Sequence, residues 1–375
     1  MFLALENILS DSKYSLNLPS KKAEKWHFSG LHSYLDRDYR LKSEVADSDF
    51  KPESDGFYGY FSDGKYIEGS LPKSVKVQEF KKALDVKNNP FSHLASSQSL
   101  SPLELVFTED IDINIYLNYS HQCFVTSAFN IIVKEGVNVN IHLLFRGGEH
   151  GFISHSSALE LYPRATLNIT QIQNFEQGAL FISQNSFLLH EYANCKSFGF
   201  LFSGEHIQQF IEAELAFESE MQATALLLGD EKQKEIFSCD ITHKADRSKS
   251  RVYSKQVLKD SAISVFDATT TIEKGTKQTE AYQASHALVL GDKAQMHAKP
   301  HLEIYSDDLI ASHGSTVGEL DKEAIDYLMS RGISECKAKE ILVEAFIKEV
   351  LDLVDEHDKE DILKLLGDEH EDQRL

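Results

Sequence analysis

Apolar and polar residues alternate in several short stretches of the chain that follow Pro102. Such alternation is typical of half-buried strands, because successive side chains of a strand point to opposite faces. No helix-like pattern separates one stretch from the next, which argues against a doubly wound α/β sheet. The alternating stretches run from Ile111 to Leu117, Val137 to Leu143, Phe198 to Phe202 and Ile211 to Phe217. The region 101–318 is therefore predicted to be all β.

Turn signals recur at a nearly constant interval in the last part of this β region. They are spaced by 15, 16 and 16 residues and lie at Asp260-Ser261, Gly275, Gly291-Asp292 and Asp307-Asp308. Such a period suits a parallel β-helix, in which each repeat adds one or two short strands and stacks on the repeat before it. An antiparallel sandwich or jelly roll also has closely spaced turns, so the pattern leaves both architectures open.

The hydrophobic period changes after Gly318 to that of a helix. A first helix is predicted from Lys322 to Arg331, with Asp321 as its N-cap and Gly332 as the residue that ends it. A second helix is predicted to begin near Ser334. Its apolar face would consist of Ala338, Ile341, Leu342, Ala345, Phe346, Val350 and Leu353. The acidic tail holds one further helix-like pattern from Ile362 to Leu366, so residues 319–375 are predicted to form a C-terminal helical domain.

The first 100 residues mix charged, aromatic and loop-like segments. Helix-like patterns occur around Glu6 and from Glu79 to Asp85. We therefore predict an N-terminal helical region over residues 1–100, ahead of the mainly β core.

Charge and composition argue against several classes of partner. The 375 residues carry a net charge of −21 and no long basic run, whereas nucleic-acid binding rests on Lys and Arg that neutralise phosphates. No stretch approaches the roughly 20 apolar residues of a membrane-spanning helix, and the start of the chain does not resemble a signal peptide. The four cysteines have no CxxC spacing and predict no disulfide framework; they are Cys123, Cys195, Cys239 and Cys336. We expect a cytoplasmic protein with neither nucleic acid nor membrane as a partner.

Several common catalytic motifs do not occur in the chain. It has no GxxxxGK[ST] phosphate loop, no GxGxxG after a predicted strand, no HExxH and no GxSxG. These absences remove the commonest nucleotide-binding, zinc-protease and α/β-hydrolase interpretations. We therefore predict no catalytic and no cofactor-binding residues of these kinds.

The segment from Lys299 to Ile333, KPHLEIYSDDLIASHGSTVGELDKEAIDYLMSRGI, resembles the SufD branch of the SufB/SufD family of iron-sulfur cluster assembly scaffolds. The resemblance rests on HLEIYSDD leading into SHGSTVG, and on the helix that ends in Leu-x-Ser-Arg-Gly-Ile at 328–333. Upstream, KGTKQTEAYQASHALVLGDKAQMHAKP and DITHKADRSKSRVYSKQVLKDSAISVF resemble the same family. Near the N-terminus, KKAEKWHFSGL, which contains Trp26, resembles its Arg-x-Glu-x-Trp motif. The likeness is therefore strong in the C-terminal third and weak at the N-terminus.

This resemblance implies a right-handed parallel β-helix flanked by N-terminal and C-terminal helical regions. It also implies a complex with a SufB-like paralogue, which carries the thiolate for the nascent cluster, and with a SufC-like ATPase. The chain would be a non-enzymatic scaffold subunit that supports the uptake of iron where SufB and SufD meet. Iron or an iron-sulfur cluster would be held there transiently, with no cofactor bound stably by the chain alone. Whether the isolated chain forms a homodimer is left open.

Two departures from the family pattern bear on the site. Ser285 and His286 stand where SufB-like sequences carry a cysteine followed by an aspartate, and a serine hydroxyl cannot replace a soft thiolate for iron and sulfide. Ala311 replaces a cysteine that many relatives have before Ser-His-Gly. His313 remains, and it resembles the histidine implicated in the family at the SufB/SufD interface, so the resemblance implies it as the candidate metal ligand. The alternative role for His313 is a turn histidine, beside Gly314, whose ring nitrogens bond the backbone.

The helical hairpin is the predicted docking surface for the SufC-like ATPase. Its candidate partner-binding residues are Tyr327, Leu328, Arg331 and Gly332. Two other functions are weighed against the scaffold with a metal role. The first is a purely architectural partner without a metal role, and the second is a carbohydrate-active β-helix enzyme, which would usually need a secretory signal.

Overall fold

The structure, a computed structural model, describes residues 2–4, 31–34, 36–41, 56–79, 95, 99 and 102–372. Trp26 and the surrounding motif, apart from Leu31, lie outside the described residues, as do the expected helix around Glu6 and residues 80–85 of the second expected helix. Among the described helices, none is long and apolar enough to cross a membrane.

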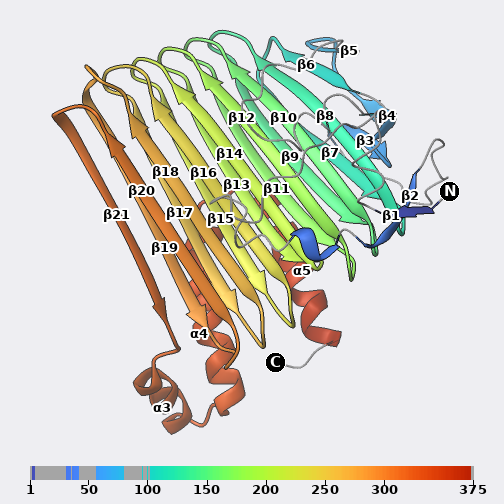
Figure 1. Cartoon of the computed structure of the whole chain (residues 1–375), viewed down its shortest axis with the longest axis vertical. Coiled ribbons are helices and arrows are strands. Elements are labelled where there is room, and N and C mark those ends of the chain that lie inside the picture. Colours follow the sequence, from blue (N-terminus) through green and yellow to red (C-terminus); the bar gives the residue numbers. More distant parts are fainter. Residues whose placement is uncertain are drawn as a thin grey trace.

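Two large sheets form the body of the molecule (Figure 1). The first, sheet A, contains in spatial order β1 (Phe2–Ala4), β2 (Asp38–Leu41), β8 (Cys123–Val133), β10 (Phe152–Leu161), β12 (Leu180–Leu189), β14 (His206–Leu215), β16 (Lys234–His243), β18 (Ile263–Ile272) and β20 (Gln295–Ile304), and β6 (Leu103–Phe107) joins it beside β8 and pairs with β5 (Val75–Glu79). The second, sheet B, contains β21 (Asp308–Gly318), β19 (Lys277–Val289), β17 (Lys249–Leu258), β15 (Glu220–Gly229), β13 (Asn194–Ser203), β11 (Thr166–Phe175), β9 (Asn138–Gly147), β7 (Ile111–Tyr119), β3 (Phe57–Ser62) and β4 (Lys65–Ser70).

From β7 to β21, consecutive strands alternate between the two sheets, and neighbours within each sheet are parallel. Each coil of the chain therefore adds one strand to each sheet, and equivalent residues of neighbouring coils lie about 28 positions apart. This is a parallel β-solenoid, as predicted, and the parallel pairing excludes the antiparallel sandwich.

The predicted turns lie between the strands, as expected from their spacing. Asp260-Ser261 separates β17 from β18, and Gly275 separates β18 from β19. Gly291-Asp292 and Asp307 fall in the next two turns, although Asp308 already begins β21. Asp260 and Gly275 have positive φ values of 43° and 90°, which glycine adopts without strain and aspartate more readily than most other residues.

Strand β13 shows why alternation alone does not locate the core. Cys195 and Leu201 point into the solenoid and belong to its central apolar cluster. The aromatic series Phe198, Phe200 and Phe202 lies on the opposite face, which is also buried, because the C-terminal helices cover it. The strand is therefore apolar on both faces, as expected for a sheet packed between two layers.

Three C-terminal helices follow the last strand: α3 (Lys322–Ser330), α4 (Glu335–Leu351) and α5 (Glu356–Asp372). The predicted cap of the first helix is confirmed, since the Asp321 side chain accepts a hydrogen bond from the Glu323 backbone. The second helix begins at Glu335, as expected, and the Ser334 side chain caps it by accepting a hydrogen bond from the Lys337 backbone. Gly332, between the two helices, has a φ of 86°.

Helix α4 packs its buried face on the outside of sheet B. Ala338 and Val350 are buried as predicted, and Ile347 and Leu351 are buried in addition. Ala345 and Leu353 are exposed, contrary to the predicted apolar face. The face is rotated because α4 meets the phenylalanines of β13 and the strands β15 and β17. Helix α5 continues along the same sheet and buries Ile362 and Leu366.

The helical region expected over the first 100 residues lies mainly outside the described residues, and of its described parts only Ala95 is in an α-helix. These parts also contain one 3-10 turn, η2 (Leu31–Tyr34), and the strands β1 to β5, of which β3 pairs in parallel with β7. The solenoid thus begins before residue 101, since β3 pairs with the edge of β7 that would otherwise be exposed.

Candidate functional site

The solenoid ends in an open coil made of β20 and β21. Among the described strands, β20 pairs only with β18 and β21 only with β19, so each terminates its sheet. No residue of either strand is fully buried. The exposed apolar side chains at this end include Tyr305, which directly follows β20, and Ile310 and Val317 of β21, which are 61%, 59% and 56% exposed. An unpaired strand edge with exposed apolar residues is a template for pairing with another chain.

His313 lies in the middle of β21 and is exposed. It is in register with Gln283 of β19, whose side chain is buried inside the solenoid. Side chains of in-register residues on parallel strands point to the same face, so His313 continues an inward-facing row at the open end. Gly314 beside it has no heavy atom within 4 Å of the position that a Cβ would take. The imidazole is therefore available to a molecule that docks on this end.

The segment SHGSTVG is part of a continuous strand and not a turn. His313 is consequently not a turn histidine, and within the described residues no hydrogen bond or ion pair of its ring is observed. The neighbouring predicted positions are explained by the same register. Ser285 points into the solenoid, where its hydroxyl donates to Gln256 at 3.3 Å, and His286 on the opposite face bonds Thr316 of β21 at 2.7 Å.

The four cysteines are not gathered into a thiolate site. Cys123, Cys195 and Cys239 are buried, and only Cys336 on α4 is exposed. Burial raises the pKa of the Cys195 thiol, which keeps it protonated and a poor ligand. The two clusters of potential metal ligands within the described residues contain no cysteine.

The predicted partner-binding residues lie together on α3 and the turn that follows it. Tyr327 is 59% exposed, and the Arg331 guanidinium lies 5.2 Å from the centre of its ring. Leu328 is half-buried and Gly332 is exposed. These residues form one exposed surface at the end of the molecule where α3 projects (Figure 1).

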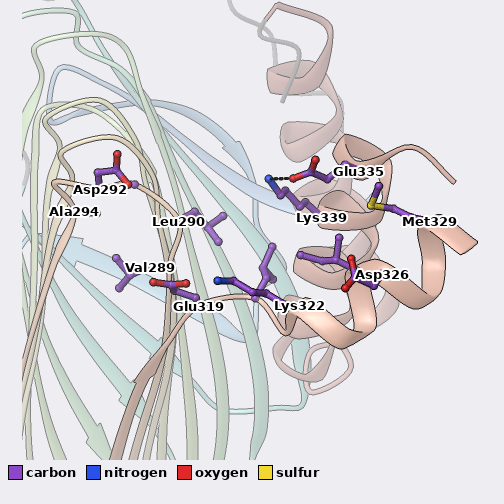
Figure 2. Close-up of a pocket in the computed structure, with 13 residues that line it drawn as sticks. Val289, Leu290, Asp292, Ala294, Glu319, Lys322, Asp326, Met329, Glu335 and Lys339 are labelled. Carbon is purple, nitrogen blue, oxygen red and sulfur yellow. Dashed lines mark ion pairs between the residues drawn. The ribbon is translucent and has the colours of Figure 1, made fainter.

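A cavity of about 770 Å³ separates this hairpin from the end of the solenoid (Figure 2). Val289 at the end of β19 and Leu290 and Asp292 in the turn that follows line one side, and Met329 of α3 and Lys339 of α4 line the other. Lys339 forms an ion pair of 2.7 Å with Glu335 on its wall. The cavity offers both apolar and charged groups next to the open coil. The sequence did not predict it, because its two walls come from separate segments, 289–294 and 319–339.

The fold defines the class of protein, a parallel β-solenoid with helices packed against one of its sheets. The family model for the SufBD core domain, described as "SUF system FeS cluster assembly", matches residues 116–346. The chain therefore belongs to the SufB/SufD family, of which it is a SufD-type member.

Its relatives include the iron-sulfur cluster assembly protein SufD of Escherichia coli, which is 24% identical over 386 aligned residues. That alignment covers 93% of this chain and 89% of the E. coli protein. SufD of Bacillus subtilis is 36% identical over 126 residues, which cover 34% of this chain and 29% of that protein. SufD of Plasmodium falciparum is 26% identical over 241 residues, covering 62% of this chain and 16% of that protein.

Proposed function

We propose that this chain is a non-enzymatic scaffold subunit for iron-sulfur cluster assembly that acts in a cytoplasmic complex with a SufB-like paralogue and a SufC-like ATPase. The observation that carries the proposal is the open terminal coil with His313 exposed in its inward-facing row. Membership of the SufB/SufD family supplies the biological context.

The SufB-like paralogue is the proposed occupant of the open coil. A second β-solenoid could continue the ladders of β20 and β21, satisfy their outer backbone groups and cover Ile310 and Val317. Burial of those side chains would add hydrophobic stabilisation to the main-chain hydrogen bonds. In the absence of the paralogue, the same edge is the surface through which the isolated chain would form a homodimer.

Iron is proposed to be the cargo at this interface. A neutral imidazole is a suitable nitrogen ligand for ferrous iron, and His313 would present it directly to the partner. This chain offers no thiolate there, because Ala311 replaces the cysteine that many relatives have. Three of its four cysteines are buried, and the exposed one, Cys336, lies on α4. The sulfur ligands would therefore come from the paralogue, and the chain alone would hold no stable cluster.

The hairpin of α3 and α4 is the proposed docking element for the ATPase. Helix α4 is anchored to sheet B, whereas Tyr327 and Arg331 on the α3 side remain exposed. The buried side chain of Lys255 fixes the geometry, since its ammonium donates to the Phe346 carbonyl at 2.6 Å and pairs with Glu349 at 2.7 Å. Movement of the docked ATPase would thus be transmitted to the sheet.

Co-purification from cells tests this proposal. An affinity-tagged chain should recover both a cysteine-bearing SufB-like subunit and a SufC-like ATPase. When the subunits are separated, the ATPase activity should be found with the SufC-like subunit. Recovery of neither subunit under conditions that preserve complexes would refute the scaffold role. Recovery of both with no dependence of iron content on His313 would favour the purely architectural alternative.

A further inference from the structure

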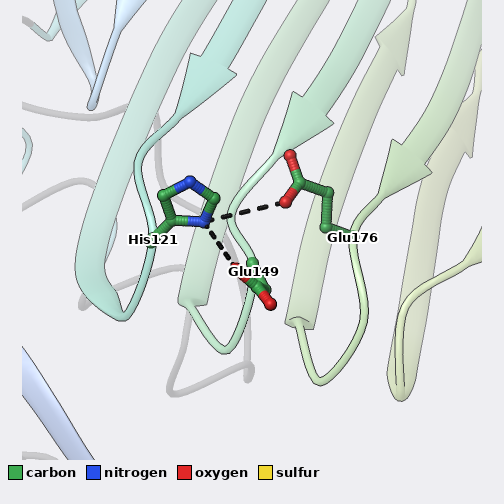
Figure 3. A group of neighbouring side chains, drawn as sticks. All are labelled: His121, Glu149 and Glu176. Atoms are coloured by element: carbon green, nitrogen blue, oxygen red, sulfur yellow. Dashed lines mark ion pairs between the residues drawn. The ribbon is translucent and has the colours of Figure 1, made fainter.

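Three consecutive turns on one edge of the solenoid bring a histidine and two glutamates together (Figure 3). His121 lies between β7 and β8, Glu149 between β9 and β10, and Glu176 between β11 and β12. These turns all carry the chain from sheet B to sheet A, so they stack directly on one another. Residues 27 or 28 positions apart thereby become neighbours.

The ligand atoms of the three side chains converge on a small volume. His121 Nδ1 lies 3.0 Å from Glu149 Oε2 and 3.7 Å from Glu176 Oε2. All three ligand atoms are within 4.8 Å of one another. Ligands bound to a transition-metal ion at about 2.1 Å are separated by about 3.4 Å in tetrahedral geometry. Small side-chain rotations would therefore place the three atoms around one ion.

The backbone holds these turns in fixed register. The Gln122 N–H donates to the Glu149 carbonyl at 2.7 Å, and the His150 N–H donates to the Gln177 carbonyl at 3.0 Å. Gln122 and His150, which follow the first two ligands, have nearly equal φ values of 49° and 51°. Because hydrogen bonds between coils set the positions of the Cα atoms, a bound ion would need to order only the side chains.

His150 supplies a second imidazole beside the cluster. Its Nε2 lies 4.0 Å from Glu149 Oε1, on the side of that carboxylate opposite to the atom that meets His121. His121, Glu149 and Glu176 have ligand atoms within 4.8 Å of one another, and His150 adds a second nitrogen that would have to move toward them to complete a set of two nitrogen and two carboxylate donors. This mixed set is typical of zinc, iron and manganese sites and differs from the all-oxygen set that calcium prefers.

The two carboxylates of this cluster have different partners from the carboxylate in the next turn along the same edge. Glu205, in the following turn, is neutralised by Arg37, whose guanidinium donates to both of its oxygens at 2.6 and 2.7 Å. In the part of the chain that the structure describes, Glu149 and Glu176 have ion pairs with histidine only. Two carboxylates around an imidazole, without a Lys or Arg partner, suit a divalent cation.

We propose that His121, Glu149 and Glu176, with His150 as an additional donor, bind a divalent first-row transition-metal ion. The site is independent of His313, because it lies in the early coils and His313 lies on the last strand. It needs neither the paralogue nor the ATPase, since all its ligands come from this chain.

Calorimetric titration of the metal-free full-length chain with Zn²⁺ alone tests the site. We expect the wild-type chain to bind one more Zn²⁺ equivalent than Glu149→Gln/Glu176→Gln. Loss of a residue that only supports a metal ligand typically lowers metal affinity about 10–100-fold. His121→Ala removes a ligand itself and should lower the affinity for the additional Zn²⁺ by more than that. Titration with Co²⁺ should give a visible absorption band in the wild type that both variants lack.

Two controls separate this site from general charge effects and from the proposed function. The variant Glu135→Gln/Glu191→Gln removes two exposed carboxylates from turns on the opposite edge and should retain the Zn²⁺ equivalent. His313→Ala should retain it as well. Unchanged stoichiometry in Glu149→Gln/Glu176→Gln, with a wild-type circular dichroism spectrum, would overturn the proposal and leave the scaffold role untouched.

Discussion

His142 of β9 and Asp358 of α5 form a buried pair that ties the C-terminal helix to the solenoid. The ring Nδ1 lies 2.6 Å from Asp358 Oδ1, and the two side chains are 3% and 2% exposed. The second ring nitrogen, Nε2, lies 3.0 Å from Asp112 Oδ1 on β7. Burial lowers the pKa of His142, but the hydrogen bond to Asp358 and the charges of Asp358, Asp112 and Asp355 outweigh it and raise the pKa to about 9. At neutral pH both nitrogens of this imidazolium therefore donate to carboxylates.

The stability of α5 should depend on alkaline pH through His142. The pKa of His142 in the folded chain is raised from 6.5 to about 9. The stabilisation that the protonated ring gives the folded state is therefore fully present below pH 6.5 and is lost as the pH rises through about 9. Thermal unfolding followed from neutral pH to about pH 10 should show this loss. The variant His142→Gln should be less stable at neutral pH and lack the dependence in this range. An equal decline in the variant would assign the effect to other groups.

Replacement of Asp358 by alanine should destabilise the docking of α5. The change leaves a buried imidazolium without its closest partner, which typically costs about 3–5 kcal/mol. Denaturant unfolding and hydrogen exchange of the α5 amides measure the effect. Glu360→Ala, an exposed acid on the same helix, should change stability by less than about 0.5 kcal/mol. Similar losses in both variants would show that helix charge, and not the pair, matters.

Phe200 on β13 should be essential for seating the helices on sheet B. Its ring is fully buried in the cluster shared with Ile347 and Val350 of α4. Phe200→Ala should cost about 3–5 kcal/mol through lost burial and the cavity left behind. Increased proteolysis of the C-terminal helices would report their release. Leu188→Ala, at a residue 41% exposed on sheet A, is the control that should have little effect.

His313→Ala should lower the iron content and cluster yield of the co-expressed complex several-fold while the three subunits still assemble. The reason is the loss of the imidazole that this chain would present to iron at the open coil. His301→Ala removes another exposed histidine of the same coil, on β20, and should leave the yield unchanged. Full cluster yield in His313→Ala would remove the metal role, and a dissociated complex would make His313 a packing residue.

Tyr327→Ala should weaken binding of the ATPase subunit. An exposed aromatic residue in contact with Arg331 has the character of an interface hot spot, and its truncation typically costs about 2 kcal/mol, or about thirtyfold in affinity. Arg331→Ala should act in the same direction. Lys364→Ala removes a positive charge from α5 instead of from the hairpin, and this variant should bind the ATPase subunit normally. Normal binding of Tyr327→Ala would place the docking surface elsewhere, and this point variant avoids deleting α4, which covers sheet B.

Local features of the chain were sufficient to predict much of the fold. Strands, turns and helix caps depend on neighbouring residues, so alternation from Ile111 to Leu117, the turn at Asp260-Ser261 and the cap at Asp321 could be read directly. The expected helix around Glu6 lies outside the described residues, whereas Glu79, the first residue of the second expected helix, ends strand β5 because it pairs with Leu103 of β6, far along the chain.

The sequence by itself determined the β character of the core, its period, the C-terminal hairpin and the resemblance to the SufB/SufD family, because each is encoded in contiguous residues. Only the tertiary structure decided which face of β13 is inside, that His313 lies in a terminal strand, and that His121 meets Glu149 and Glu176. Alternation assigns residues to the two faces of a strand, but it cannot tell which face points into the solenoid when both faces are buried. Contacts between residues 27 or 28 positions apart depend on the register of stacked coils, which hydrogen bonds between distant segments establish.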